Sequence, residues 1–383
     1  MLLNGRDNGR AIGIITLSGD FNYGNKLQLF ATSNIYRNLG YRPIYLSFNH
    51  KEPLAAHPKR LLKSVVRGKE TESVYPFLDA RGQAFSRFGA GIETRKILSV
   101  VDVCADEFSY FAVGSDQVWN PCYAWQNSLY SGIDRAYHAF VDPHARKESL
   151  DWYFLRFARR EQRLTTAPSI GLDTLNSRQS KWLAEGLSGF NNLSIRESRG
   201  AEIIEELTGK KALVVCDPTL AVPKPVWLEV SNDEVTPREP YVFSYVLGSH
   251  SGDYEKVIHS ATRGGELPVV SLSDRNDEGE PGAGPAEFIS LISRASHVVT
   301  DSFHASVFSA IMETPLTIIQ RADGGGSMFS RLTSLSEALG IQGKIYDGKD
   351  IDFSVASDYE NVAEAIERQR SAFMEYLKGC LND

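Results

Sequence analysis

A short segment in the last third of the chain combines acidic, hydroxyl and imidazole side chains. Asp301-Ser302-Phe303-His304 follows the apolar stretch 297–300 and precedes apolar residues at helical spacing. Asp301 or Ser302 can cap that helix, which puts His304 in its first turn beside backbone N–H groups that attract an anion. A histidine next to a bound anion can transfer a proton. The alternative is a half-buried histidine that only supports the end of the helix.

A second polar segment follows the predicted strand 108–113. Ser115, Asp116, Gln117 and Trp119 lie in one loop at the end of that strand. Carboxylate and amide groups can bind sugar hydroxyls, and an indole can stack on a sugar ring, so this loop is a candidate acceptor site. The alternative is an aspartate that caps a turn and a tryptophan that belongs to the core.

The turn after the first predicted strand, 12–17, is a third candidate. Asn22, Tyr23 and Gly24 lie just before the helix that follows, where backbone amides can cradle a phosphate. Neither the glycine-rich dinucleotide fingerprint nor the P-loop pattern is present, so the turn carries no nucleotide-binding motif. An ordinary turn between a strand and a helix explains the same residues without a ligand.

Two arginines complete the candidate site. Arg196 follows a predicted strand and Arg331 follows a glycine-rich loop, and either guanidinium can bind a carboxylate or phosphate with two parallel hydrogen bonds. Surface arginines without a ligand are the alternative. Asp301 and His304 lie one helical turn apart without a third ligand near them, so we expect no metal site and no cofactor.

The elements that position these residues alternate between apolar strands and helices. A fully apolar strand such as 12–17 is typical of a parallel sheet that is buried on both faces. The alternation restarts after 219–240, a stretch with several prolines that predicts a linker. The other predicted strands are 43–46, 108–113, 193–195, 212–216, 241–247, 267–272, 297–300 and 316–319, and helices are predicted at 251–263, 287–294, 302–312 and 329–339 and before Gly40 and Gly209.

This pattern predicts an α/β fold class, with two Rossmann-like domains that face a central cleft. We place the N-terminal domain at 1–222 and the C-terminal domain at 223–352. The tail, 353–383, contains a predicted long amphipathic helix that can cross back to the first domain. Ligands are expected beyond the carboxyl ends of the strands, where the candidate segments lie.

The composition limits the classes of function. Forty-one basic and 48 acidic residues give a net charge of −7, so no global field attracts nucleic acid and any anion site must be built locally. No apolar run approaches the ~18 residues of a membrane span, which leaves only peripheral membrane contact. The four cysteines lie far apart, and the N-terminus lacks the apolar core of a signal peptide, so we expect a cytoplasmic protein with reduced thiols.

The order of the polar segments resembles that of the polysaccharide pyruvyl transferase family over about residues 12 to 340. The segments 113–121 and 299–304 are the specific ones, and the others support them. The matching segments are Asn22-Tyr23-Gly24-Asn25, Val113-Gly114-Ser115-Asp116-Gln117-Val118-Trp119-Asn120-Pro121, Ser194-Ile195-Arg196-Glu197, Cys216-Asp217-Pro218-Thr219-Leu220, Val299-Thr300-Asp301-Ser302-Phe303-His304 and Ser330-Arg331.

The resemblance implies a glycosyltransferase-B-like fold and transfer of pyruvate from phosphoenolpyruvate to a pair of sugar hydroxyls, which forms a ketal. It also implies that the N-terminal domain holds the acceptor side and part of the donor site, and that the C-terminal domain holds the donor side. The acceptor would be a cell-surface polysaccharide, its repeat-unit precursor or a glycolipid, free or linked to a lipid. Phosphoenolpyruvate carries a carboxylate and a phosphate. We expect Arg196, the helix start at 301–303 and the turn at 22–24 to bind these two groups, with Arg331 as a further candidate. His304 and Arg196 are the expected catalytic residues, with His304 as the acid and base.

Two other classes of function remain open. A nucleotide-sugar-dependent glycosyltransferase of the same fold would need a carboxylate for the ribose late in the second domain, for which Glu313 is the candidate. A non-catalytic sugar-binding relative is the other class. It is suggested by Ser302-Phe303, where some branches of the family have Arg-Leu, and by Ala305, where many relatives have glycine.

Overall fold

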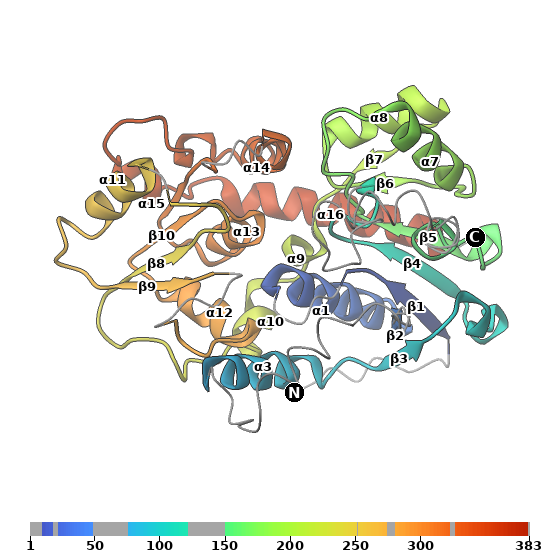
Figure 1. Ribbon diagram of the computed structural model, residues 1–383, viewed down its shortest axis with the longest axis horizontal. Helices are drawn as coiled ribbons and strands as arrows, with labels where there is room; N and C mark the ends of the chain where they lie inside the picture. The colour runs from blue at the N-terminus through green and yellow to red at the C-terminus, as the bar shows by residue number, and fades with distance from the viewer. Residues whose placement is uncertain are drawn as a thin grey trace, which may run out of the picture.

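Two sheets, each built of parallel strands, lie side by side in the protein (Figure 1). The first has the strand order β3-β2-β1-β4-β5, which is the order of a Rossmann-like unit, and the second has the order β11-β10-β8-β9. A pair of such units is the architecture of the glycosyltransferase-B-like fold. The predicted fold class is therefore confirmed. The computed structural model describes residues 10–17, 22–48, 76–121, 150–250, 252–273, 280–321 and 326–381.

The strands are short and all their pairings are parallel in the described part of the chain. The first sheet contains β1 (Ala11–Ile15), β2 (Arg42–Phe48), β3 (Thr94–Ile97), β4 (Tyr110–Gly114) and β5 (Arg163–Thr166). The second sheet contains β8 (Val242–Tyr245), β9 (Val269–Leu272), β10 (His297–Thr300) and β11 (Leu316–Ile318), and a separate pair is formed by β6 (Ser194–Ile195) and β7 (Leu213–Val214).

Helices connect the strands and cover the sheets. The α-helices are α1 (Tyr23–Asn38), α3 (Pro76–Gly89), α7 (Ser177–Leu187), α8 (Ser198–Thr208), α9 (Pro218–Ala221), α10 (Lys224–Glu229), α11 (Gly252–Ala261), α12 (Pro285–Ser293), α13 (Phe303–Met312), α14 (Gly326–Leu339), α15 (Phe353–Ser357) and α16 (Val362–Leu381). Short 3-10 helices lie at Val100–Asp102, Ala105–Glu107, Arg160–Gln162 and Gln342–Lys344.

Local sequence explains how the elements near the site begin and end. Every residue of β1 is buried, as its apolar sequence predicts for the centre of a parallel sheet. The side-chain oxygen of Asn22 accepts a hydrogen bond from the backbone N–H of Asn25 at 2.9 Å and so caps α1. Helix α8 ends at Gly209, whose φ of 68° lies in the left-handed region that favours glycine.

Some predicted elements are corrected by the structure. The proline-containing stretch 219–240, predicted as a linker, holds α10 and most of α9, and the residues of α9 are buried. The predicted tail helix is divided into α15 and α16. Strands β3 and β5 and helix α7 were not predicted. Strand β3 is a polar edge strand, and β5 follows a stretch of charged and aromatic residues that hides the period.

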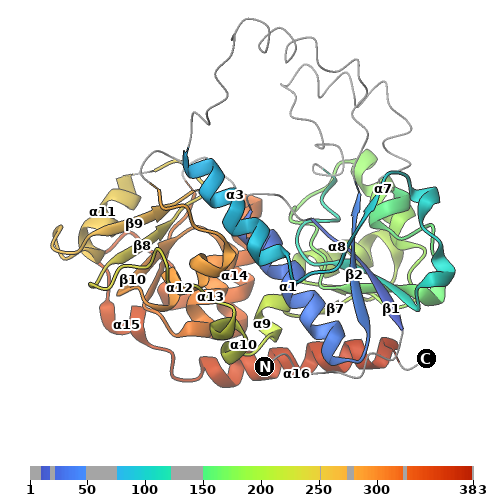
Figure 2. The same ribbon diagram turned by 90° about the horizontal axis from the view of Figure 1, so that it is seen from below.

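Helix α16 runs beneath both sheet units (Figure 2). On the first unit, the hydroxyl of Tyr376 lies 2.6 Å from the hydroxyl of Thr165, and the hydroxyl of Tyr110 donates to the backbone oxygen of Leu381. On the connecting segment, Nε of Arg370 donates to the backbone oxygen of Ala221. The helix therefore ties the end of the chain to the first sheet. No helix among the described residues is long and apolar enough to cross a membrane.

A shared core holds the two units together. One apolar cluster contains residues of both sheets, including Ile12 of β1 and Val298 of β10. Tyr23, at the start of α1, stacks on Phe288 of α12 with ring centres 4.7 Å apart, and its hydroxyl donates to the backbone oxygen of Ala283. The two units are thus joined by close packing rather than by a single flexible connection.

Replacement of Tyr376 by phenylalanine tests the attachment of α16. Loss of the hydrogen bond to Thr165 should lower the free energy of unfolding by about 1 kcal/mol, the usual net contribution of such a bond. Urea denaturation of the variant measures this change. The neighbouring exposed Glu375→Gln is the control, which should unfold like the parent protein. Equal stability of Tyr376→Phe and the control would show that the hydroxyl contributes nothing.

Candidate functional site

A polar cavity of about 240 Å³ lies where the loops after β1, β4, β8, β10 and β11 approach one another. These loops follow the carboxyl ends of parallel strands, which is the usual ligand position in such folds. Both sheet units contribute, so the cavity exists only because they are packed together. Its lining residues are Leu17, Asn22, Gly24, Asn25, Asp116, Gln117, Tyr245, Leu247, Asp301, Ser302, Phe303, His304, Arg321 and Arg331.

His304 lies in the first turn of α13, where the sequence predicts it. Ser302 is the N-cap, and its hydroxyl accepts a hydrogen bond of 3.5 Å from the backbone N–H of Ala305. The imidazole lies against Gly24 at the start of α1: a Cβ added to Gly24 would be 2.1 Å from Nδ1 of His304. A glycine is therefore required there, because any larger residue would displace the ring. The starts of α1 and α13 meet at this point, and the N-terminus of a helix favours an anion.

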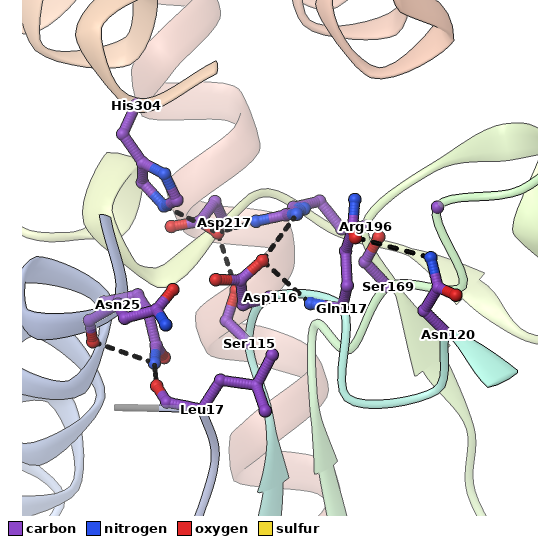
Figure 3. A network of polar contacts seen from close by, with 12 residues as sticks. Leu17, Asn25, Ser115, Asp116, Gln117, Asn120, Ser169, Arg196, Asp217 and His304 are labelled. Atoms are coloured by element: carbon purple, nitrogen blue, oxygen red, sulfur yellow. Dashed lines mark hydrogen bonds and ion pairs between the residues drawn. The ribbon is translucent and has the colours of Figure 1, made fainter. Parts of the chain in front are cut away.

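Asp217 is the buried carboxylate on the other side of His304 (Figure 3). Its Oδ2 accepts hydrogen bonds from Oγ of Ser115 and Nη1 of Arg196, each at 2.6 Å, and lies 3.9 Å from Nε2 of His304. Its Oδ1 accepts from the backbone N–H and the hydroxyl of Thr219 at 2.9 and 2.6 Å. The carboxylate thus connects a strand-end loop, an arginine and the histidine.

Arg196 is enclosed rather than exposed to the cavity. Its side chain is 2% exposed, and its guanidinium carbon lies 4.5 Å from the centre of the Phe303 ring. Nη2 lies 3.8 Å from Oδ1 of Asp116, in addition to the contact between Nη1 and Asp217. The arginine therefore balances two carboxylates beneath Phe303, and Phe303 separates it from the cavity.

The charges of this cluster shift the pKa values of its members. Burial would raise the pKa of Asp217, but Arg196, His304 and the hydrogen bonds of the carboxylate outweigh it and hold the pKa far below its ordinary value. Burial is also the largest influence on His304 and lowers its pKa; Asp217 and Asp116 oppose this, whereas Arg196 adds to it. His304 is therefore neutral at pH 7.

The pKa of Arg196 is raised by its neighbours. Burial alone would lower it, but the carboxylates of Asp217, Asp116 and Glu197 act in the opposite direction and prevail. Arg331 has fewer compensating carboxylates, and burial followed by repulsion from Arg196 lowers its pKa to about 10. Both guanidinium groups remain charged at pH 7.

Arg321 was not predicted and lines the cavity. Its Nε lies 3.1 Å from Oδ2 of Asp301, and its side chain is 20% exposed. Asp301 also accepts hydrogen bonds from the backbone N–H groups of Leu247 and Gly248 at 2.8 and 2.9 Å, so it braces the loop after β8 and holds the arginine. The sequence signal for Arg321 is its place shortly after the strand β11.

Arg331 reaches the same cavity from α14. Nη2 and Nη1 of Arg331 lie 2.9 and 3.0 Å from the amide oxygen of Gln117, in the amide orientation in which that oxygen accepts. Arg331 is buried, so the alternative of a surface arginine is wrong for this residue. Gln117 and Arg331 thus bring the loop after β4 and the helix α14 together.

Besides Arg196, three predicted site residues do not line the cavity. Trp119 is fully buried, with its ring stacked on Phe154 and Nε1 donating to the backbone oxygen of Tyr153, so it cannot stack on a sugar from this position. Ser115 is also fully buried, and its hydroxyl donates a hydrogen bond to Asp217. Tyr23 belongs to the core between the two units. For these residues the structural alternative is the better description.

The other predicted residues are brought together. Those that line the cavity are Asn22, Gly24, Asp116, Gln117, Asp301, Ser302, Phe303, His304 and Arg331. Ala305 is fully buried and does not line it, so its Cβ does not intrude where a ligand would lie. The residues 122–149, which follow the predicted acceptor loop, lie outside the described residues.

Asp217 was part of a motif in the sequence, but it was not predicted as a site residue. The sequence feature that could have indicated Asp217 is the pair Asp217-Pro218, because an aspartate before a proline is typical of the start of a helix. No group of three or more His, Cys, Asp or Glu side chains that could hold a metal ion occurs among the residues that the structure describes.

A second cavity of about 430 Å³ lies on the other side of Phe303 and Arg331. It is mostly apolar, with Val215, Leu220 and Leu335 in its walls, and it also touches Arg196 and Asp217. Phe303 and Arg331 line both cavities and so form a partition between a polar chamber and an apolar one.

Comparison with solved structures finds similar folds at low sequence identity. The wall teichoic acid polymerase TagF (H444N variant) is 11% identical, with a TM-score of 0.42 over 98% of this chain and 86% of that chain. A UDP-glucosyltransferase from Polygonum tinctorium is 12% identical (TM-score 0.38; 98% and 99% covered), and the spinosyn rhamnosyltransferase SpnG with thymidine diphosphate is 11% identical (0.40; 97% and 96%). Such low scores say nothing about the substrate of this chain.

The comparison with curated proteins gave no match. A sequence model of the family described as polysaccharide pyruvyl transferase matches residues 22–322, which include the starts of α1 and α13, the loop after β4, Arg196 and Asp217. Because this match spans most of the chain and every part of the polar cavity except Leu17 and Arg331, the chain belongs to the polysaccharide pyruvyl transferase family.

Proposed function

We propose that the protein transfers pyruvate from phosphoenolpyruvate to two hydroxyls of a saccharide in the cytoplasm and releases phosphate. The acceptor would be a cell-surface polysaccharide, its repeat-unit precursor or a glycolipid, free or lipid-linked. The proposal is carried by the position of His304, which lies between the buried Asp217 and a cavity lined by two guanidinium groups, Arg321 and Arg331. A general acid and base beside two anion-binding groups is what the reaction requires.

The donor is small and carries two anionic groups. In a chain with net charge −7, the cavity concentrates positive charge through Arg321, Arg331 and the starts of α1 and α13. We assign the phosphate and the carboxylate of phosphoenolpyruvate to these groups. Arg196, which lies beneath Phe303, supports the site electrostatically through Asp217 and Asp116.

The reaction then proceeds in two steps that balance without a redox partner. In the first, one sugar hydroxyl adds to the central carbon of the donor, and its proton passes to the methylene carbon, which becomes a methyl group. In the second, the other hydroxyl bonds to the same carbon as the bond to phosphate breaks, and its proton leaves with the phosphate. Neutral His304 can accept the hydroxyl proton and pass it on in either step.

A nucleotide-sugar-dependent reaction has less support. Its ribose would need a carboxylate such as Glu313, but this residue ends α13 opposite the end that carries His304, about 13 Å along the helix axis. Its side chain is 55% exposed and lies 3.5 Å from Nζ of Lys224. It does not line the polar cavity. The position of Glu313 therefore favours the pyruvyl transfer reaction over the nucleotide-sugar-dependent reaction.

Substitution of His304 by glutamine is the main test of the proposal. Glutamine is close in size and still forms hydrogen bonds, so the fold and donor binding should persist. Turnover in a phosphate-release assay should fall by roughly 10²–10⁴, the usual range for loss of a general acid or base. The melting temperature of the same preparation is the control for folding. A destabilised variant with normal turnover would end this mechanism.

Arg321→Lys tests the assignment of the donor anions. Lysine keeps the charge but not the planar pair of N–H groups, so KM for phosphoenolpyruvate should rise by about 10- to 150-fold, equivalent to ~1.5–3 kcal/mol. Arg294→Lys, at an exposed arginine that pairs with Asp233, is the matched control and should leave KM unchanged. An unchanged KM in Arg321→Lys would remove this residue from the donor site.

Chelation tests whether the reaction needs a metal. The cavity neutralises the donor with arginines, so turnover should be the same before and after dialysis against EDTA. Phosphate release is measured at saturating donor in both samples. Activity that is lost on chelation and restored by Mg²⁺ or Mn²⁺ would contradict the prediction.

A further inference from the structure

The two nitrogens of the His304 ring have different surroundings. Nε2 is buried without a hydrogen-bond partner and faces Oδ2 of Asp217 at 3.9 Å. Nδ1 lies on the side of Gly24, a residue that lines the polar cavity. One nitrogen of the ring therefore faces the carboxylate of Asp217 (Figure 3), and the other lies beside Gly24 at the polar cavity.

Asp217 does not line the polar cavity, so it can act on the reaction only through its neighbours. The carboxylate is fixed in place, because Ser115, Arg196 and Thr219 all donate hydrogen bonds to it. The pKa of this carboxyl group is far below its ordinary value, as described above, so it remains ionised. A fixed, ionised carboxylate beside a ring nitrogen favours the tautomer with its proton on that nitrogen.

We propose that Asp217 is a positioning residue for His304, which keeps the proton of the neutral ring on Nε2 and leaves the lone pair of Nδ1 directed at the substrate hydroxyl. When Nδ1 takes the hydroxyl proton, the ring becomes an imidazolium, and the same carboxylate stabilises the new charge. The role in catalysis rests on the proposed function, whereas the choice of tautomer does not.

The other charges that face His304 set the size of this effect. Asp116, from the loop after β4, acts in the same direction as Asp217, and Arg196 and Arg331 act in the opposite direction. The elements that pack against the ring, α1 and the start of α13, contribute N–H groups that disfavour a cation. Asp217 has the largest influence among the charged neighbours, so its charge should control the protonation of the ring.

Asp217→Asn tests the proposal directly. Asparagine keeps the shape and an oxygen for Thr219, but removes the charge. In ¹⁵N spectra of histidine-labelled protein without substrate, His304, assigned by comparison with His304→Gln, should lose the dominance of the Nε2–H tautomer. Its titration should move to lower pH by about one pH unit, because a carboxylate that favoured the imidazolium is gone.

Kinetic measurements on Asp217→Asn test whether the contact between Asp217 and His304 affects turnover. A neutral His304 is needed as the base, so activity rises with pH through its titration. The acid limb of the profile of kcat/KM should therefore move to lower pH in Asp217→Asn. At the same time kcat should fall roughly 10- to 100-fold, with KM for phosphoenolpyruvate within about threefold of the parent value. A variant that is only less stable, with the titration and tautomer of His304 unchanged, overturns the proposal.

Two further variants keep the test decisive. Asp352, which caps α15 in the same way, is the matched control, and Asp352→Asn should leave the His304 spectrum unchanged. If Asp217→Asn does not fold, Ser115→Ala removes a donor to Oδ2 but keeps the charge, so the titration of His304 should move to higher pH. No movement, or movement to lower pH, contradicts the proposal. If the parent protein does not transfer pyruvate, the proposed function fails while the spectroscopic result still decides the role of Asp217 toward the ring.

Discussion

The buried ion pair between Arg196 and Asp217 is the interaction on which the site depends. Both side chains are almost fully enclosed, and a charge without its partner at this depth would cost several kcal/mol. The pair connects the end of β6 with the start of α9, the segment that leads from one sheet unit to the other. It also places a carboxylate beside His304 and a guanidinium beneath Phe303. A site of this kind stays intact only while the surrounding packing excludes water.

That packing comes from the way the two units share a core. The rings of Tyr23 and Phe288 and the long helix α16 fix one unit against the other, so the loops of both sheets meet at a defined distance. Catalytic groups held by rigid elements need little reorganisation during a reaction. Gly24 shows how close the approach is, because even one methyl group there would collide with the histidine.

The distribution of charge explains how an acidic protein can offer a site for an anion. Arg196 is neutralised by two carboxylates and lies behind Phe303, whereas Arg321 and Arg331 line the cavity itself. The arginines at the site therefore divide into one enclosed charge, Arg196, and two charges that line the polar cavity, Arg321 and Arg331. Phe303 and Arg331 form the boundary of a second, apolar cavity, so the polar chamber is closed on that side by a ring and a cation.

The sequence alone determined the alternation of strands and helices, the strand β10 and the N-terminal position of His304 on α13, because these follow from local apolar periodicity and capping. It also placed the polar segments at the ends of strands, where the topology of parallel sheets gathers them. Only the tertiary structure decided that Trp119, Ser115 and Tyr23 turn inward, that Arg196 is covered by Phe303, and that Asp217 and Arg321 belong to the site. The physical reason is that burial and charge pairing depend on residues far apart in the chain, such as Ser115 and Asp217, whose contact no local pattern encodes.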